Sequence, residues 1–126
     1  MQSFVYFEDL VDGRTYWGSE CCADKEEMLE YARKNDPWPF HADEEAAKKS
    51  SFGVIIASGG YTITLGYRSL TGLYNAPQTA WAFLGGLEWP NLKFHLPVRP
   101  GDRLRTRMTI QPRESRASPV GELSPP

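Results

Sequence analysis

The chain has 126 residues, of which 40% are hydrophobic, and its formal net charge at pH 7 is −2. This length supports one domain with a modest core. Nucleic acid or an anionic membrane surface would need clustered positive charge, which this balance argues against. No apolar run is long enough to span a bilayer, and Met1 to Leu10 lacks the basic and apolar parts of a signal peptide. We therefore expect a cytoplasmic protein with no nucleic-acid or membrane partner.

The N-terminal part of the chain predicts a strand followed by a helix. Residues 14–22 alternate weakly, which indicates a strand that contains Cys21 and Cys22. Adjacent cysteines would form a strained disulfide and offer no metal-ligand spacing, so we expect reduced thiols and no metal site. Asp24 and Glu27 then have the spacing of a capping box at the start of a helix.

The stretch NDPWPFHADEEAAKKSSFGVIIASGG is the most chemically loaded part of the sequence. Pro37 and Pro39 disfavour helical geometry at the residues before them, so we predict a loop from Asp36 to His41. Fully extended, this loop would span roughly 16 Å, so a shared site requires it to curl back. Asp36 could then take a proton from a water that His41 holds. Aspartate before proline is also a common turn opener, and a lone histidine is often a surface residue.

Several residues extend this pattern in a fixed order: Asp36, Pro39, Phe40, His41, Asp43, Glu44, Ala46, Phe52, Gly53, Ile56, Ala57 and Gly59. Together they resemble the MaoC-like acyl dehydratases, relatives of the (R)-specific enoyl-CoA hydratases. That family has an α+β hot-dog fold, in which an antiparallel sheet wraps a long central helix. Its catalytic pair is an Asp and a His five positions apart. The resemblance therefore implies a hot-dog fold over about residues 4–110 and catalytic roles for Asp36 and His41.

The chain departs from the family pattern at three places. Trp38 stands where the typical hydratase motif has Asn, and Ser58 stands where family hydratases often have His. Family members also continue into two further strands, whereas this chain ends in a segment rich in Pro and Ser. We predict a MaoC-like domain over residues 1–111 and a tail over residues 112–126. The sheet would then be incomplete at its C-terminal end, which favours pairing with another chain.

A long helix is expected from Tyr61 to Leu73, starting near Ser58. Local propensity leaves helix and strand close over this segment, and the family resemblance decides for the central helix. The first N–H groups of a helix have no partner within it. Those at Ser58, Gly59 and Gly60 are therefore candidates to bind the oxygen of a thioester carbonyl as it gains negative charge. Close packing of the helix against its neighbours is the alternative explanation for the two glycines.

The segment DEEAAKK predicts a short helix, because its acidic start and basic end suit the helix dipole. Asp43, Glu44 and Glu45 are interpreted as a solvated helix start, since no second His or Cys lies at a ligand spacing. Lys48 and Lys49 are either surface charge or contacts for the phosphates of a carrier nucleotide.

Two strands are predicted near the C-terminus. Residues 89–98 alternate clearly between apolar and polar, with His95 on the polar side, and residues 104–110 alternate again. The sequence RPGD between them indicates a turn, so we expect a hairpin.

The resemblance implies an acyl-thioester hydratase or dehydratase that adds water to, or removes it from, a 2-enoyl-CoA type substrate. Coenzyme A or an acyl carrier would be part of the substrate, with no further cofactor, and the chain would form a homodimer. Trp38, Tyr61 and Trp81 are candidates to shape an acyl pocket or, alternatively, are plain core residues. Two other functions stay open: a hot-dog thioesterase, and a non-catalytic subunit that binds acyl thioesters or serves assembly.

Overall fold

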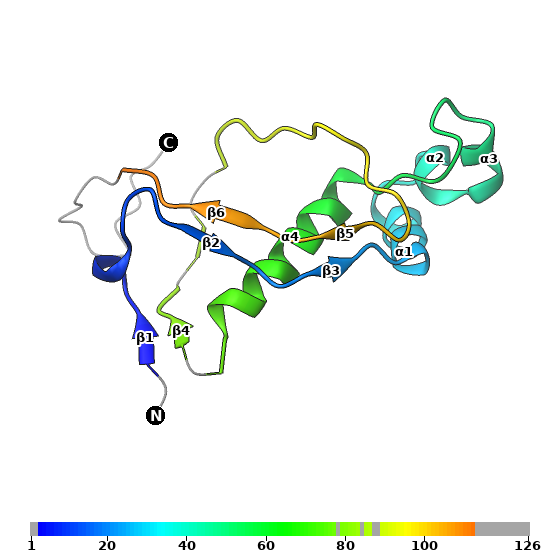
Figure 1. Ribbon diagram of the computed structural model, residues 1–126. Coiled ribbons are helices and arrows are strands. Elements are labelled where there is room, and N and C mark those ends of the chain that lie inside the picture. Colours follow the sequence, from blue (N-terminus) through cyan, green and yellow to red (C-terminus); the bar gives the residue numbers. More distant parts are fainter. Residues whose placement is uncertain (1–2, 78, 84, 87–88, 113–126) are drawn as a thin grey trace.

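The structure, a computed structural model, describes residues 3–77, 79–83, 85–86 and 89–112 (Figure 1). Its helices over these residues are α1 (Lys25–Asn35), α2 (Pro39–Ala42), α3 (Glu44–Lys48) and α4 (Gly59–Tyr74), with a 3-10 turn η1 (Phe7–Asp9). Its strands are β1 (Ser3–Val5), β2 (Thr15–Trp17), β3 (Cys21–Cys22), β4 (Thr79–Trp81), β5 (Arg103–Leu104) and β6 (Arg107–Thr109). Apart from Pro112, the predicted tail lies outside the described residues.

The long helix α4 lies at the centre of the fold, and the three smaller helices gather at its N-terminal end (Figure 1). The predicted central helix is therefore confirmed, with its first residue at Gly59. The short acidic helix is also confirmed as α3, because the Asp43 side chain accepts hydrogen bonds from the N–H groups of Glu45 and Ala46. The sequence thus predicted both of these helices.

A two-stranded antiparallel ribbon crosses α4 (Figure 1). β2 pairs with β6, placing Thr15 opposite Thr109, and β3 pairs with β5, placing Cys22 opposite Arg103. A separate pair, β1 with β4, is parallel. The α+β class is confirmed, although the strands are short.

The predicted strand over residues 14–22 is interrupted where it touches α4. A Cβ atom at Gly18 would lie 2.6 Å from the carbonyl oxygen of Ser69, so only glycine allows this approach. At the break, the Ser19 N–H donates to the Ser69 carbonyl at 3.0 Å, and the Thr106 N–H donates to Ser69 Oγ at 2.8 Å. Ser69, which is 1% exposed, therefore accepts hydrogen bonds from two backbone N–H groups that have no partner across the ribbon at this break.

The prediction of a strand over residues 89–98, and of a hairpin with the following strand, is wrong. This segment has no strand in the described chain, and β5 and β6 pair with β3 and β2 instead. Leu92, Phe94 and Leu96 stay exposed at 52%, 55% and 82%. Alternation creates an apolar face, but a strand forms only where a neighbouring strand takes up its backbone groups.

The core lies where α1 packs on α4. Its buried side chains include Met28, Leu29, Ile55, Tyr61 and Leu65. The predicted helix after Asp24 is confirmed as α1, and the Asp24 side chain accepts from the Glu27 N–H at 3.0 Å. None of the helices described is long and apolar enough to cross a membrane.

Two glycines in α4 offer a matched stability test. A Cβ atom at Gly66 meets nothing within 4 Å, so Gly66→Ala should stabilise the fold by about 0.5–1 kcal/mol through helix propensity. At Gly72 a Cβ atom would lie 2.8 Å from Ser19 Cβ, so Gly72→Ala should destabilise it by about 1–3 kcal/mol. Urea unfolding of both variants measures the difference. Equal effects would contradict the close contact between α4 and the ribbon.

Candidate active site

Asp36 and His41 lie beside each other near the N-terminal end of α4. His41 Nε2 is 3.6 Å from Asp36 Oδ2, so the chain curls back as a shared site requires. The His41 side chain is buried, whereas 34% of the Asp36 side chain is exposed. Part of the Asp36 side chain is therefore open to solvent beside the buried imidazole.

A backbone carbonyl fixes the tautomer of the neutral His41 ring. His41 Nδ1 lies 2.7 Å from the carbonyl oxygen of Ile56, which can only accept, so Nδ1 carries the proton. In the neutral ring, Nε2 then has a lone pair, and this nitrogen faces Asp36. A carboxylate and a bare Nε2 are both acceptors and do not bond each other. A water that lies to one side of both atoms can donate one hydrogen to each.

Ser58 holds the carboxylate of this pair. Its Oγ donates to Asp36 Oδ2 at 2.8 Å, and its side chain is buried. Ser58 occupies the N-cap position of α4, yet its hydroxyl makes no capping bond there. Its side chain is therefore committed to Asp36, which is the C-cap residue of α1.

The second half of the predicted loop is helical, which corrects the expectation for His41. Pro39 begins α2 at a position where its missing N–H costs no helix bond. Trp38 before it is extended, as a residue before proline prefers. The Ile56 N–H donates to the Phe40 carbonyl at 3.1 Å, so Ile56 fixes α2 through both of its backbone groups.

The two glycines at the start of α4 each face an aromatic ring. A Cβ atom at Gly59 would lie 3.0 Å from Phe94 Cζ, and one at Gly60 would overlap the Tyr31 hydroxyl. Close packing therefore accounts for both glycines. Their role as hydrogen-bond donors to a ligand stays a prediction.

The three aromatic residues predicted for an acyl pocket lie in three different places. Trp38 is 62% exposed, and Tyr61 is 2% exposed within the core. Trp81 lies in β4, where it contacts the Tyr16 ring edge to face at 4.9 Å between centroids. The structure thus groups Asp36, His41 and Ser58 but separates the aromatic residues.

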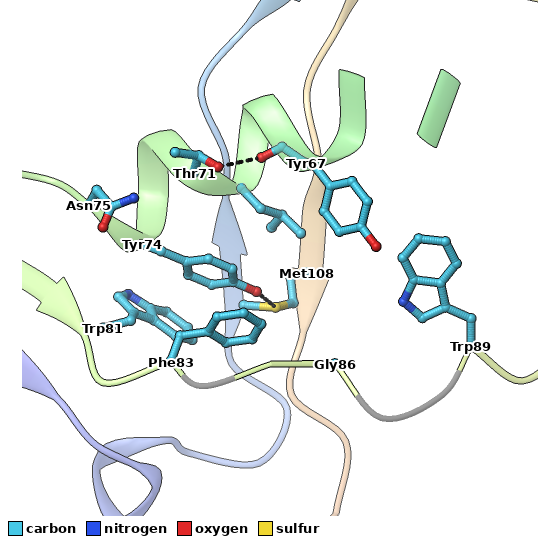
Figure 2. Close-up of a pocket in the computed structure, with 10 residues that line it drawn as sticks. Tyr67, Thr71, Tyr74, Asn75, Trp81, Phe83, Gly86, Trp89 and Met108 are labelled. Atoms are coloured by element: carbon cyan, nitrogen blue, oxygen red, sulfur yellow. Dashed lines mark hydrogen bonds between the residues drawn. The ribbon is translucent and has the colours of Figure 1, made fainter. Parts of the chain in front are cut away.

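A hollow of about 780 Å³ runs along the C-terminal half of α4 (Figure 2). Its aromatic and sulfur-containing lining residues are Tyr67, Tyr74, Trp81, Phe83, Trp89 and Met108. Figure 2 shows Tyr67 and Trp89 next to each other along this hollow, with 5.5 Å between ring centroids. Of the predicted pocket residues, Trp81 lines it.

The sequence analysis missed two contacts that organise the pair. The Ile56 carbonyl leaves no signal, because any residue type supplies one. The bond from Ser58 to Asp36 joins residues 22 positions apart, and a lone serine gives no indication of such a partner. Ser58 itself was predicted, with a different role.

Comparison with known proteins identifies the family of the chain. Residues 12–123 match the model of a family described as MaoC like domain. The chain belongs to this family. The matched range includes the Asp36–His41 pair and all of α4.

Solved structures and a curated relative agree with this placement. The MaoC-like dehydratase from Rhodospirillum rubrum is 34% identical, with a TM-score of 0.65 over 86% of this chain and 71% of that one. R-hydratase PhaJ1 from Pseudomonas aeruginosa, unliganded, shares the fold at 20% identity, with a TM-score of 0.62 over 85% of this chain and 65% of its own. The uncharacterized protein YdeM of Bacillus subtilis is 26% identical over 93% of this chain and 81% of YdeM. The predicted hot-dog fold is confirmed.

A polar brace fixes α1 against α4 in this MaoC-like domain. The Tyr61 hydroxyl donates to Glu27 Oε1 at 2.8 Å, and Arg68 contacts both carboxylate oxygens of Glu27 at 2.8 and 3.0 Å. Glu27 thus bonds across to α4 and does not complete the predicted capping box. The hydrogen bond from Arg68, then that from Tyr61, lowers the pKa of Glu27. The brace thus holds α1, which Asp36 caps, against α4, which begins after Ser58.

The brace predicts a pH dependence of stability. Burial, and next the bond to Glu27, raises the pKa of Tyr61 from 10.0 to about 12. A raised pKa means that this stabilisation is complete below pH 10 and is lost as pH rises toward 12. The difference in unfolding free energy between the wild type and Tyr61→Phe should therefore shrink across this window. Urea unfolding at several alkaline pH values tests this, and a constant difference would contradict it.

Proposed function

We propose that this MaoC-like domain is an acyl-thioester hydratase or dehydratase acting on a 2-enoyl thioester. The observation that carries the proposal is the facing of Asp36 Oδ2 and His41 Nε2 across 3.6 Å, with His41 Nδ1 committed to Ile56. One water molecule beside the two acceptors can donate to both, through bent hydrogen bonds. Its oxygen lone pair is then free to attack a carbon atom.

In the hydration direction, the water oxygen bonds to the β carbon of the enoyl group while Asp36 takes one of its protons. The electron pair of the double bond moves toward the thioester carbonyl. The proton then reaches the α carbon, directly from Asp36 or through the adjacent His41 Nε2. One hydrogen stays on the new β-hydroxyl, so water adds across the double bond. Dehydration follows the same steps in reverse.

Negative charge on the carbonyl oxygen requires nearby donors. We place that oxygen at the start of α4, where the N–H groups of Gly59 and Gly60 and the positive end of the helix dipole lie. Ser58 joins this region to Asp36 by its 2.8 Å hydrogen bond. The acid–base pair and the helix start are thus adjacent. The β carbon and the carbonyl of one enoyl thioester are also close together, so one substrate can contact both.

Coenzyme A or an acyl carrier is the expected handle of the substrate. Proton transfer and oxyanion stabilisation are the only chemistry the reaction requires, so the proposal includes no cofactor. The homodimer and the cytoplasmic location expected from the sequence are part of the same proposal. The R-hydratase of this fold and the 34% identical MaoC-like dehydratase support the reaction class.

The first test follows the enoyl absorbance of crotonyl-CoA during incubation with the purified chain. Asp36→Asn and His41→Ala should each lower the rate at least about 100-fold while the fold is kept, because an amide cannot take the proton of the attacking water and alanine has no imidazole to hold that water. His95→Ala, at the other histidine of the chain, is the control and should keep the wild-type rate. No decay from a folded wild-type sample would overturn the proposal and favour a non-catalytic acyl-binding subunit. Release of free thiol without hydration would indicate a thioesterase.

Ser58→Ala tests the orientation of Asp36. Losing the 2.8 Å bond frees the carboxylate to rotate, so kcat should fall on the order of 10-fold, less than on loss of Asp36 itself. Ser58→Thr keeps a hydroxyl and should recover most of the rate. Steady-state kinetics with crotonyl-CoA gives both values. An unchanged kcat in Ser58→Ala would show that the hydroxyl does not position the carboxylate.

A further inference from the structure

Phe94 covers the beginning of α4. Three of its ring carbons lie 3.0, 3.2 and 3.5 Å from the position that a Cβ atom would take at Gly59. The ring is 55% exposed, so one part contacts the helix and the rest remains open. Phe94 belongs to the segment that alternation had wrongly assigned to a strand.

The direction of this contact places the ring at the N-terminal end of the helix. Cβ bonds in an α-helix tilt toward the N-terminus, so a ring over the Cβ position of Gly59 lies beside the first turn. Gly59 follows Ser58, whose hydroxyl bonds Asp36 at 2.8 Å. Phe94 therefore stands next to the place where the proposed function puts the thioester carbonyl.

An apolar side chain at this place has no hydrogen-bonding group and can act only by excluding water. Two electrophilic carbons of an enoyl thioester can accept water: the β carbon, and the carbonyl carbon. Attack at the carbonyl carbon forms a bond from the water oxygen and breaks the carbon–sulfur bond. The thiol leaves with a proton, and a carboxylic acid is the second product. The acid–base pair beside the helix start could serve either attack unless water is kept from the carbonyl.

We propose that Phe94 is a specificity-determining residue that shields the thioester carbonyl from water and so favours hydration over hydrolysis. This inference rests on the proposed function, because it assumes that the thioester lies at the start of α4. The exposed part of the ring forms one wall for the thioester. The apolar wall also strengthens the electrostatic effect of the helix N–H groups by removing competing water.

The experiment compares the full-length wild type with Phe94→Ala, Phe94→Leu and Leu96→Ala. Leu96 is a nearby control, since its side chain is 82% exposed. Hydration is measured with crotonyl-CoA. Hydrolysis is measured as free thiol released from butyryl-CoA, which has no double bond to hydrate, after subtraction of the signal from Cys21 and Cys22.

Phe94→Ala should lower the rate of hydration on the order of 10-fold and raise the rate of thiol release by a similar factor. Both changes are smaller than the roughly 100-fold loss expected when a reacting group is misplaced. Phe94→Leu still covers the first turn and should stay within about 3-fold of the wild type in both assays, which is about half of one tenfold step in barrier height. Leu96→Ala should match the wild type. Circular dichroism of Phe94→Ala confirms that its fold is kept.

Thiol release that does not rise in Phe94→Ala, while the wild type hydrates crotonyl-CoA, would overturn this inference and leave the proposed function intact. A wild type that hydrates nothing would overturn the proposed function instead. In that case a rise in thiol release in Phe94→Ala would still support Phe94 as a shield of the carbonyl. A wild type that hydrates nothing, together with no rise in thiol release in Phe94→Ala, would overturn both.

Discussion

The hydrogen bond from Ser58 to Asp36 joins the end of α1 to the beginning of α4, and the geometry of the site depends on it. Neither helix alone carries the pair, because Asp36 caps α1 and His41 lies in α2. The brace of Glu27 with Tyr61 and the packing of Gly60 against Tyr31 hold the same two helices together. Local stability and the position of Asp36 therefore rest on one helix–helix contact.

The backbone supplies much of the organisation of this site. Ile56 binds the Phe40 carbonyl through its N–H and His41 Nδ1 through its carbonyl, so a single residue sets both the position of α2 and the tautomer of the imidazole. In the neutral ring with its proton on Nδ1, Nε2 is an acceptor toward Asp36. The chain thereby holds two acceptors close together without a direct bond between them. A water that donates to both stabilises this arrangement.

Sequence reasoning predicted the elements whose signals are local. Asp24 and Asp43 cap the helices that they were expected to begin, and the five-residue spacing of Asp36 and His41 indicated their pairing through the family resemblance. Signals that depend on a distant partner failed. The alternation of residues 89–98 could not show that no strand of the described chain takes up the backbone groups of this segment. The contact of Ser69 with the ribbon likewise joins segments far apart in the chain.

Trp38 in place of the family Asn raises the question of what shapes the turn between the two reacting residues. In this chain the backbone of Trp38 does so. Its N–H donates to the Asp36 carbonyl at 2.8 Å, and its carbonyl accepts from the N–H groups of His41 and Ala42 at 2.9 and 3.0 Å. Its side chain is 62% exposed and makes a parallel ring contact with Phe40. Because these bonds use main-chain atoms only, the approach of His41 to Asp36 does not require an amide side chain at this position.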